Sequence, residues 1–109
     1  MRKILEVEET FLLKGRGLVI APQLPVVQDC KFIPFEAIIE LVRPDGSRDR
    51  CQASFQLTHS RFYSGASGFK IDIVLLDVRK QQVPVGTHLY GGNEIFNALY
   101  HATDGELPG

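Results

Sequence analysis

A chain of 109 residues, 44% hydrophobic and 23% charged, has the size and composition of one domain that buries a core without disulfides or metal ions. Its formal net charge of −1 excludes a global positive field, so binding to nucleic acid or an anionic membrane would need a local patch. The N-terminal sequence MRKILEVEE reaches glutamates too early for a secretory signal, and no apolar run is long enough to span a bilayer. We therefore expect a cytoplasmic protein that does not enter a membrane.

The chain opens with two apolar runs separated by Gly15-Arg16-Gly17. Residues 3–13, KILEVEETFLL, predict a first strand, and residues 17–22, GLVIAP, continue the sheet. A phosphate-binding P-loop has its second glycine followed by lysine and a helix, whereas Gly17 precedes strand-forming residues. The sequence favours a bulge or tight bend at these glycines, and the alternative is an exposed Arg16 that contacts an anion.

A hairpin is predicted in the middle of the chain. The segments FEAIIELV, 35–42, and RDRCQASFQLT, 48–58, are joined by a turn in which Pro44 presets φ, Asp45 caps its own backbone and Gly46 accepts a positive φ. Residues of the second segment alternate, which is typical of a half-buried strand with a polar outer face. The face expected to be apolar contains Cys51, Ala53, Phe55 and Leu57, with Asp49 at its start.

The next segment, FKIDIVLLDVR at 69–79, predicts a third long strand. Val74 and Leu76 make its second half apolar on both faces, so another part of the protein must cover it. The following QQVPVGTHLY, 81–90, predicts a turn at Gly86 and a short final strand.

Only the C-terminal segment has a helical pattern. Asn93 is a suitable N-cap for a helix over 93–102, and Glu94 suits the positive end of the helix dipole. The apolar stripe comprises Ile95, Leu99 and Ala102, with Phe96 and Tyr100 beside it. One short helix against many strands predicts a single all-β domain, a small antiparallel barrel over about 3–90 with a helical tail over 91–109.

Two stretches, EETFLLKGRGLVIAP and SGASGFKIDIVLLDVRKQQVPVGTHLY, resemble the start and the end of the second domain of elongation factor Tu and related translational GTPases. The resemblance spans Lys3 to Tyr90 and implies a small Greek-key β-barrel. In that family the domain contributes to aminoacyl-tRNA binding and packs against a GTP-binding domain. This chain contains no P-loop, so the resemblance implies a barrel that stands alone.

Two groups of residues are candidates for RNA contact. Phe62 and Tyr63, beside the cation of Arg61, could stack on an RNA base, or they belong to a hairpin connection whose aromatic residues cover the end of the barrel. Arginines on both sides of the Pro-Asp-Gly turn form a basic cluster. This cluster could contact phosphate or an acidic partner, or it could be only a strand face exposed to solvent. That cluster consists of Arg43, Arg48 and Arg50.

No motif for catalysis accompanies the three histidines, and neither Cys30 nor Cys51 has a second cysteine at a zinc or redox spacing. We therefore expect no metal and no cofactor, and a non-catalytic module that binds a protein partner or serves as a scaffold. The alternatives are weak RNA or tRNA binding, and a small enzyme whose site is assembled from distant residues. The helix residues Ile95, Phe96, Leu99 and Tyr100 either pack on their own barrel or dock on a second copy or another protein.

Overall fold

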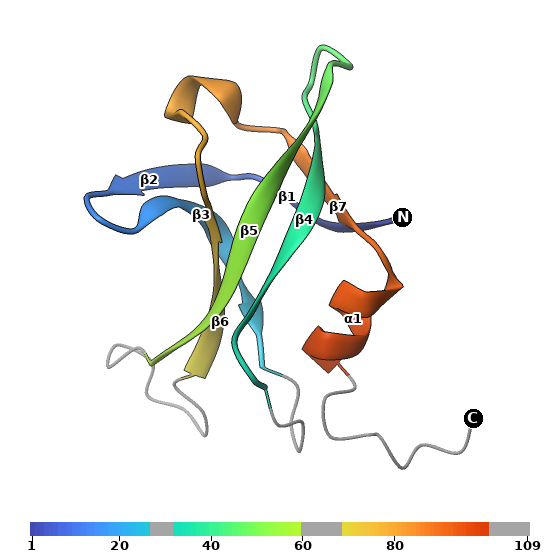
Figure 1. Cartoon of the computed structure of the whole chain (residues 1–109). Helices are drawn as coiled ribbons and strands as arrows, with labels where there is room; N and C mark the ends of the chain where they lie inside the picture. Colours follow the sequence, from blue (N-terminus) through green and yellow to red (C-terminus); the bar gives the residue numbers. More distant parts are fainter. Residues whose placement is uncertain (27–31, 60–68, 101–109) are drawn as a thin grey trace.

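The structure, a computed structural model, describes residues 1–26, 32–59 and 69–100 (Figure 1). These residues form seven strands, a 3-10 turn and one short helix. In chain order the elements are β1 (Arg2–Glu6), β2 (Glu9–Leu13), β3 (Gly17–Pro25), β4 (Phe35–Val42), β5 (Arg48–His59), β6 (Phe69–Leu75), η1 (Lys80–Gln82), β7 (His88–Gly91) and α1 (Asn93–Tyr100). The expected all-β fold with a C-terminal helix is confirmed.

The strands form one antiparallel sheet in the order β1-β7-β4-β5-β6-β3-β2. Within it, β4, β5 and β6 follow one another and β7 returns beside β4, which is a Greek key. The sheet curls strongly, as Figure 1 shows, so that its two edge strands approach each other. The fold is therefore a small barrel-like sheet.

The link between β1 and β2 joins the two edges of the sheet. The Val7 amide donates to the Thr87 carbonyl before β7 at 2.8 Å, while the Glu8 amide donates to the Ala21 carbonyl of β3 at 2.8 Å. The prediction of one strand over 3–13 is thus wrong: the chain changes partner at Val7, pairing first with β7 and then with β3. A hydrophobic pattern cannot show such a change because apolar residues continue through both segments, on either side of Val7.

The core lies on the concave face of the sheet. Alternate residues of the central strands point inward and are buried, as the alternation in β5 predicts. The largest of these side chains include Leu18, Ile20, Ile39, Leu41, Phe55, Ile71, Ile73 and Leu89. Burying each contributes about 1.5–3 kcal/mol, so the described residues hold a substantial core without a disulfide.

Two details of the predicted strands differ in the structure. Leu57 is 41% exposed because β5 extends beyond the start of β4, where Phe35 pairs with Phe55. Among the described strands, only β6 lies beside this part of β5. The predicted strand over 69–79 ends at Leu75, and Asp77 lies in a turn with a positive φ of 58°.

Helix α1 packs on its own sheet. Ile95 and Leu99 are fully buried, Phe96 is 7% exposed, and the Arg2 guanidinium lies 4.1 Å from the centre of the Phe96 ring. These three apolar side chains therefore form no exposed patch for a second protein. The side chain of Tyr100 and all of Ala102 lie outside the described residues.

The helix begins at Asn93, as predicted, but Asn93 is not its cap residue. The Gly92 carbonyl accepts a hydrogen bond from the Phe96 amide at 3.4 Å, so Gly92 occupies the cap position and Asn93 is the first helical residue. In the described part of the chain, no helix is long and apolar enough to cross a membrane.

Candidate functional site

The Gly-Arg-Gly segment is a tight bend pressed against β6. Gly15 has φ +83°, the Arg16 amide donates to the Leu13 carbonyl at 3.0 Å, and Gly17 has φ +127°. A Cβ atom on Gly17 would lie 2.7 Å from the Leu75 carbonyl oxygen and 3.1 Å from Cγ1 of Val74. Gly17 is thus required both for its backbone conformation and for the close approach of β3 to β6.

Arg16 extends from this bend across the outer face of the sheet. Its guanidinium donates to Oε1 of Gln56 on β5 and lies 4.0 Å from Oδ2 of Asp72 on β6. Val74 of β6 lies on the same face as Asp72, is fully buried and lies against Gly17 of the bend. The bend therefore covers one of the two apolar residues that required a cover. Arg16 is 43% exposed, but its contacts lie within the protein, which favours the bend over the anion site.

A bulge in β3 adds a polar group to this face. Ile20 pairs with Ile73 and Leu24 with Ile71, so the chain between them bulges opposite Asp72. Nε2 of Gln23 in the bulge donates to Oδ1 of Asp72 at 2.7 Å. Asp72 is nearly buried, and this bond gives its carboxylate a hydrogen-bond partner.

The edge strand β2, which borders this face, exposes three consecutive apolar side chains. Phe11 is 45% exposed, Leu12 65% and Leu13 41%. Phe11 and Leu13 pair with Val19 and Gly17 of β3 and point to the outer face of the sheet. Leu12 points to the inner face, as Thr10 does. We call Phe11, Leu12 and Leu13 the β2 apolar surface.

Two open depressions flank the β2 apolar surface. One, of about 490 Å³, lies between Phe11, Val19, the β3 bulge, Lys70 and Asp72. The other, of about 610 Å³, lies between Leu12, Leu13, the Gly-Arg-Gly bend, Leu76 and Asp77. Apolar side chains beside hollows with a few polar groups are the usual features of a surface that binds a partner.

The 3-10 turn η1 lies beside β2, and one hydrogen bond between them is described at the backbone edge of β2. Nζ of Lys80, at the start of η1, donates to the Thr10 carbonyl at 2.9 Å. This bond places the Thr10 carbonyl on the side of β2 that faces away from β3.

The β2 apolar surface was not predicted from the sequence, because strand residues were expected to alternate between apolar and polar. The three successive apolar residues FLL were the signal for it.

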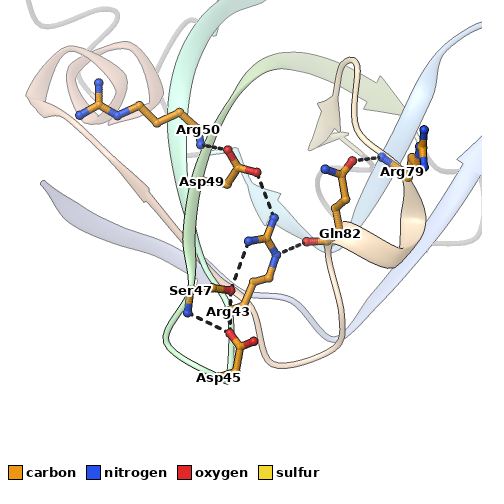
Figure 2. Close-up of polar contacts among 7 residues, drawn as sticks. All are labelled: Arg43, Asp45, Ser47, Asp49, Arg50, Arg79 and Gln82. Atoms are coloured by element: carbon orange, nitrogen blue, oxygen red, sulfur yellow. Dashed lines mark hydrogen bonds and ion pairs between the residues drawn. The ribbon is translucent and has the colours of Figure 1, made fainter.

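The basic cluster at the β4–β5 hairpin is divided by the structure. Arg43 is enclosed, as Figure 2 shows: its Nε donates to the Gln82 carbonyl at 2.6 Å and its Nη2 lies 3.2 Å from Oδ2 of Asp49. Arg48 pairs with Glu40 at 3.1 Å, and the side chain of Arg50 points away from the cluster in Figure 2. Arg43 is thus committed to contacts within the protein, whereas the paired but 67% exposed Arg48 and the exposed Arg50 face solvent at this hairpin.

The turn of this hairpin has the predicted chemistry. Oδ1 of Asp45 accepts hydrogen bonds from the Ser47 hydroxyl and amide, at 2.6 and 2.9 Å, and these lower the pKa of Asp45. Gly46 has φ +87°. The Arg50 amide and then the Arg43 guanidinium lower the pKa of Asp49, so the carboxylates of Asp45 and Asp49 are both ionised at neutral pH.

Gly86 lies in the predicted turn before β7. It has φ +93°, and its amide donates to the Val7 carbonyl at 2.8 Å.

The remaining candidates provide no chemical centre within the described part of the chain. Arg61, Phe62 and Tyr63 lie outside it, as does Cys30. Cys51 is buried, and this burial raises the pKa of its thiol to about 11, so it is a protonated core residue. Across residues 1–26, 32–59 and 69–100, no group of three metal-binding side chains converges.

Comparisons of the sequence with protein-family models and with characterised proteins, and of the fold with solved structures, find no match.

The enclosed position of Arg43 gives a first testable prediction. Replacing Arg43 with Gln should lower the free energy of unfolding by about 1–3 kcal/mol, because the Gln82 carbonyl loses a charged donor. Urea denaturation measures the change. The exposed Arg50→Gln is the control and should change stability by less than about 0.5 kcal/mol. Equal effects of the two substitutions would contradict a structural role for Arg43.

Proposed function

We propose that this protein is a non-catalytic binding module whose β2 apolar surface binds an extended apolar segment of a protein partner. The observation that carries the proposal is the exposure of Phe11, Leu12 and Leu13 together on a strand at the edge of the sheet. A strand added at such an edge gains main-chain hydrogen bonds, and its side chains gain selectivity from adjoining hollows.

The neighbouring residues suit this role because they anchor one end of β2 to the rest of the sheet. The Gly-Arg-Gly bend fixes the end of β2, and Arg16 attaches the bend to Gln56 on β5. A surface already ordered before binding loses little conformational entropy when a partner docks. The depression beside Phe11 would receive an apolar side chain of the bound segment, while Gln23 and Asp72 at its margin offer polar contacts.

RNA binding is the weaker proposal. Arg43 is committed to contacts within the protein, and Arg48 already pairs with Glu40. The net charge of −1 adds no general attraction for phosphate. The resemblance to the second domain of translational GTPases agrees with the fold, but a shared role in translation stays a prediction.

The experiment compares what tagged variants retain from nuclease-treated native extract. Wild-type protein should retain a protein partner, and Phe11→Ser and Leu12→Ser should each lose it, because each removes apolar surface from β2. Ile38→Ser is the matched control: Ile38 is 53% exposed on β4, away from β2, and its replacement should leave retention unchanged.

Two results would contradict the proposal. Retention that is equal in the β2 variants and the wild type would show that the partner binds elsewhere. A partner that wild-type protein retains from untreated extract but not from nuclease-treated extract would favour RNA binding. In that case Arg48→Glu and Arg50→Glu, and not the β2 variants, should reduce its retention.

A further inference from the structure

Building on the proposed function, we propose that the segment that binds β2 is β2 of a second copy of this chain, paired antiparallel about Phe11. Three observations support this occupant: the side on which the β2 backbone is open, the order of charges along the strand, and its apolar residues on both faces.

The contact with Lys80 shows which backbone groups of β2 face away from β3. Because the Thr10 carbonyl accepts a hydrogen bond from Lys80, which does not belong to β3, we infer that the polar backbone groups of Thr10 face the outer edge. In an antiparallel ladder every second residue faces the same side, so the amide and carbonyl of Leu12 face it too. The edge therefore offers two residues to a neighbouring strand.

These two residues determine a symmetric register. When Thr10 of one copy lies opposite Leu12 of the other, both residues exchange main-chain hydrogen bonds with their counterparts, and Phe11 lies opposite Phe11 on the two-fold axis. The same register places Glu9 opposite Leu13 and Glu8 opposite Lys14. Glu8 and Lys14 are both exposed, so each dimer gains two cross-strand pairs of opposite charge.

The side chains of β2 agree with a strand that has neighbours on both sides. Apolar residues on only one face are usual at a sheet edge, but β2 exposes Phe11 and Leu13 outward and Leu12 inward. Pairing with a second copy continues the sheet across the two-fold axis and brings the two β2 apolar surfaces together. An open apolar edge is otherwise a site of uncontrolled association.

Lys80 competes with this pairing. Its ammonium donates to the Thr10 carbonyl, which is the acceptor that the Leu12 amide of the second copy would use. Lysine beside an edge strand commonly opposes strand addition. Lys80 must therefore release Thr10, and η1, which lies beside β2, must make room as the dimer forms. Removal of the Lys80 side chain should strengthen association.

The test measures self-association of the purified full chain by sedimentation velocity over a wide concentration range. Glu8→Lys alone and Lys14→Glu alone should each weaken the dimer roughly tenfold, since each places like charges opposite one another twice. An equal mixture of the two variants should dimerise as well as wild type, because every contact in the mixed dimer again joins opposite charges. Lys80→Ala should raise the association constant severalfold.

The control is Glu36→Lys, which changes the same charge at an exposed position on β4 and should leave the dimer unchanged. A mixture that associates no better than either variant alone would overturn the proposed pairing. So would a chain that stays monomeric at millimolar concentration both as wild type and as Lys80→Ala. In that case, loss of an extract partner in Phe11→Ser would still support the proposed function, with another protein as the occupant.

Discussion

Gly17→Val is expected to lower the free energy of unfolding by about 3 kcal/mol or more, of which strain in a left-handed conformation contributes about 1–3 kcal/mol. The added Cβ would meet the Leu75 carbonyl oxygen at 2.7 Å, and a backbone atom in a paired strand cannot move aside cheaply. Typical domains have only about 5–15 kcal/mol of stability, so this variant should be severely weakened. Urea denaturation of the soluble protein measures the effect.

Gly15→Ala separates conformation from crowding. Gly15 also has a positive φ, +83°, but a Cβ there would meet nothing within 4 Å, so the cost should be only about 1–2 kcal/mol. Arg16→Ala removes one exposed hydrogen bond to Gln56 and should cost about 1 kcal/mol. A larger loss in Arg16→Ala than in Gly17→Val would mean that the arginine, and not the bend, is the structural requirement.

The hairpin over β4 and β5 could be predicted from sequence because its determinants are local. Pro44, Asp45 and Gly46 specify the turn, and alternation specifies which side of β5 is buried. The positive φ of Gly46 and Gly86 follows in the same way. Such features depend on neighbours in the chain, and these are visible in the sequence.

The change of partner at Val7 could not be predicted, because it depends on which strands lie on either side of the closing sheet. The course of Arg16 to Gln56, 40 positions away, likewise depends on the register of β3, β6 and β5. The same holds for Arg43, which the sequence places in an exposed basic cluster. Its enclosure comes from η1, which returns to the hairpin from a distant part of the chain.

The candidate site illustrates the same limit. The sequence directs attention to arginines and aromatic residues, because these have recognisable binding chemistry. The β2 apolar surface consists of ordinary strand residues, and only the position of β2 at the edge of the sheet leaves them uncovered. The exposure of these residues depends on the order of the strands in the sheet. The only local sign of it in the sequence is the run of three apolar residues, FLL.

Truncation after Gly92 is expected to destabilise the monomer strongly. The truncation removes Ile95 and Leu99, which are buried in the same core as β1 and β7, together with the nearly buried Phe96. Each fully buried side chain contributes about 1.5–3 kcal/mol, so the loss should reach several kcal/mol and lower the melting temperature markedly. Circular dichroism during heating measures the change.

Single substitutions make this test independent of the residues after Tyr100, which the truncation also removes. Leu99→Ala should cost about 2–5 kcal/mol, as other buried leucine truncations do, because Leu99 is 1% exposed. Asn97→Ala, at an exposed position of α1, is the control and should leave stability almost unchanged. If Leu99→Ala left the melting temperature of the monomer unchanged and abolished self-association instead, α1 would be an interface helix and the packing described for it would be wrong. If the truncated chain melts early but the charge-reversed β2 mixture still pairs, then α1 stabilises the fold and β2 alone provides the surface between copies.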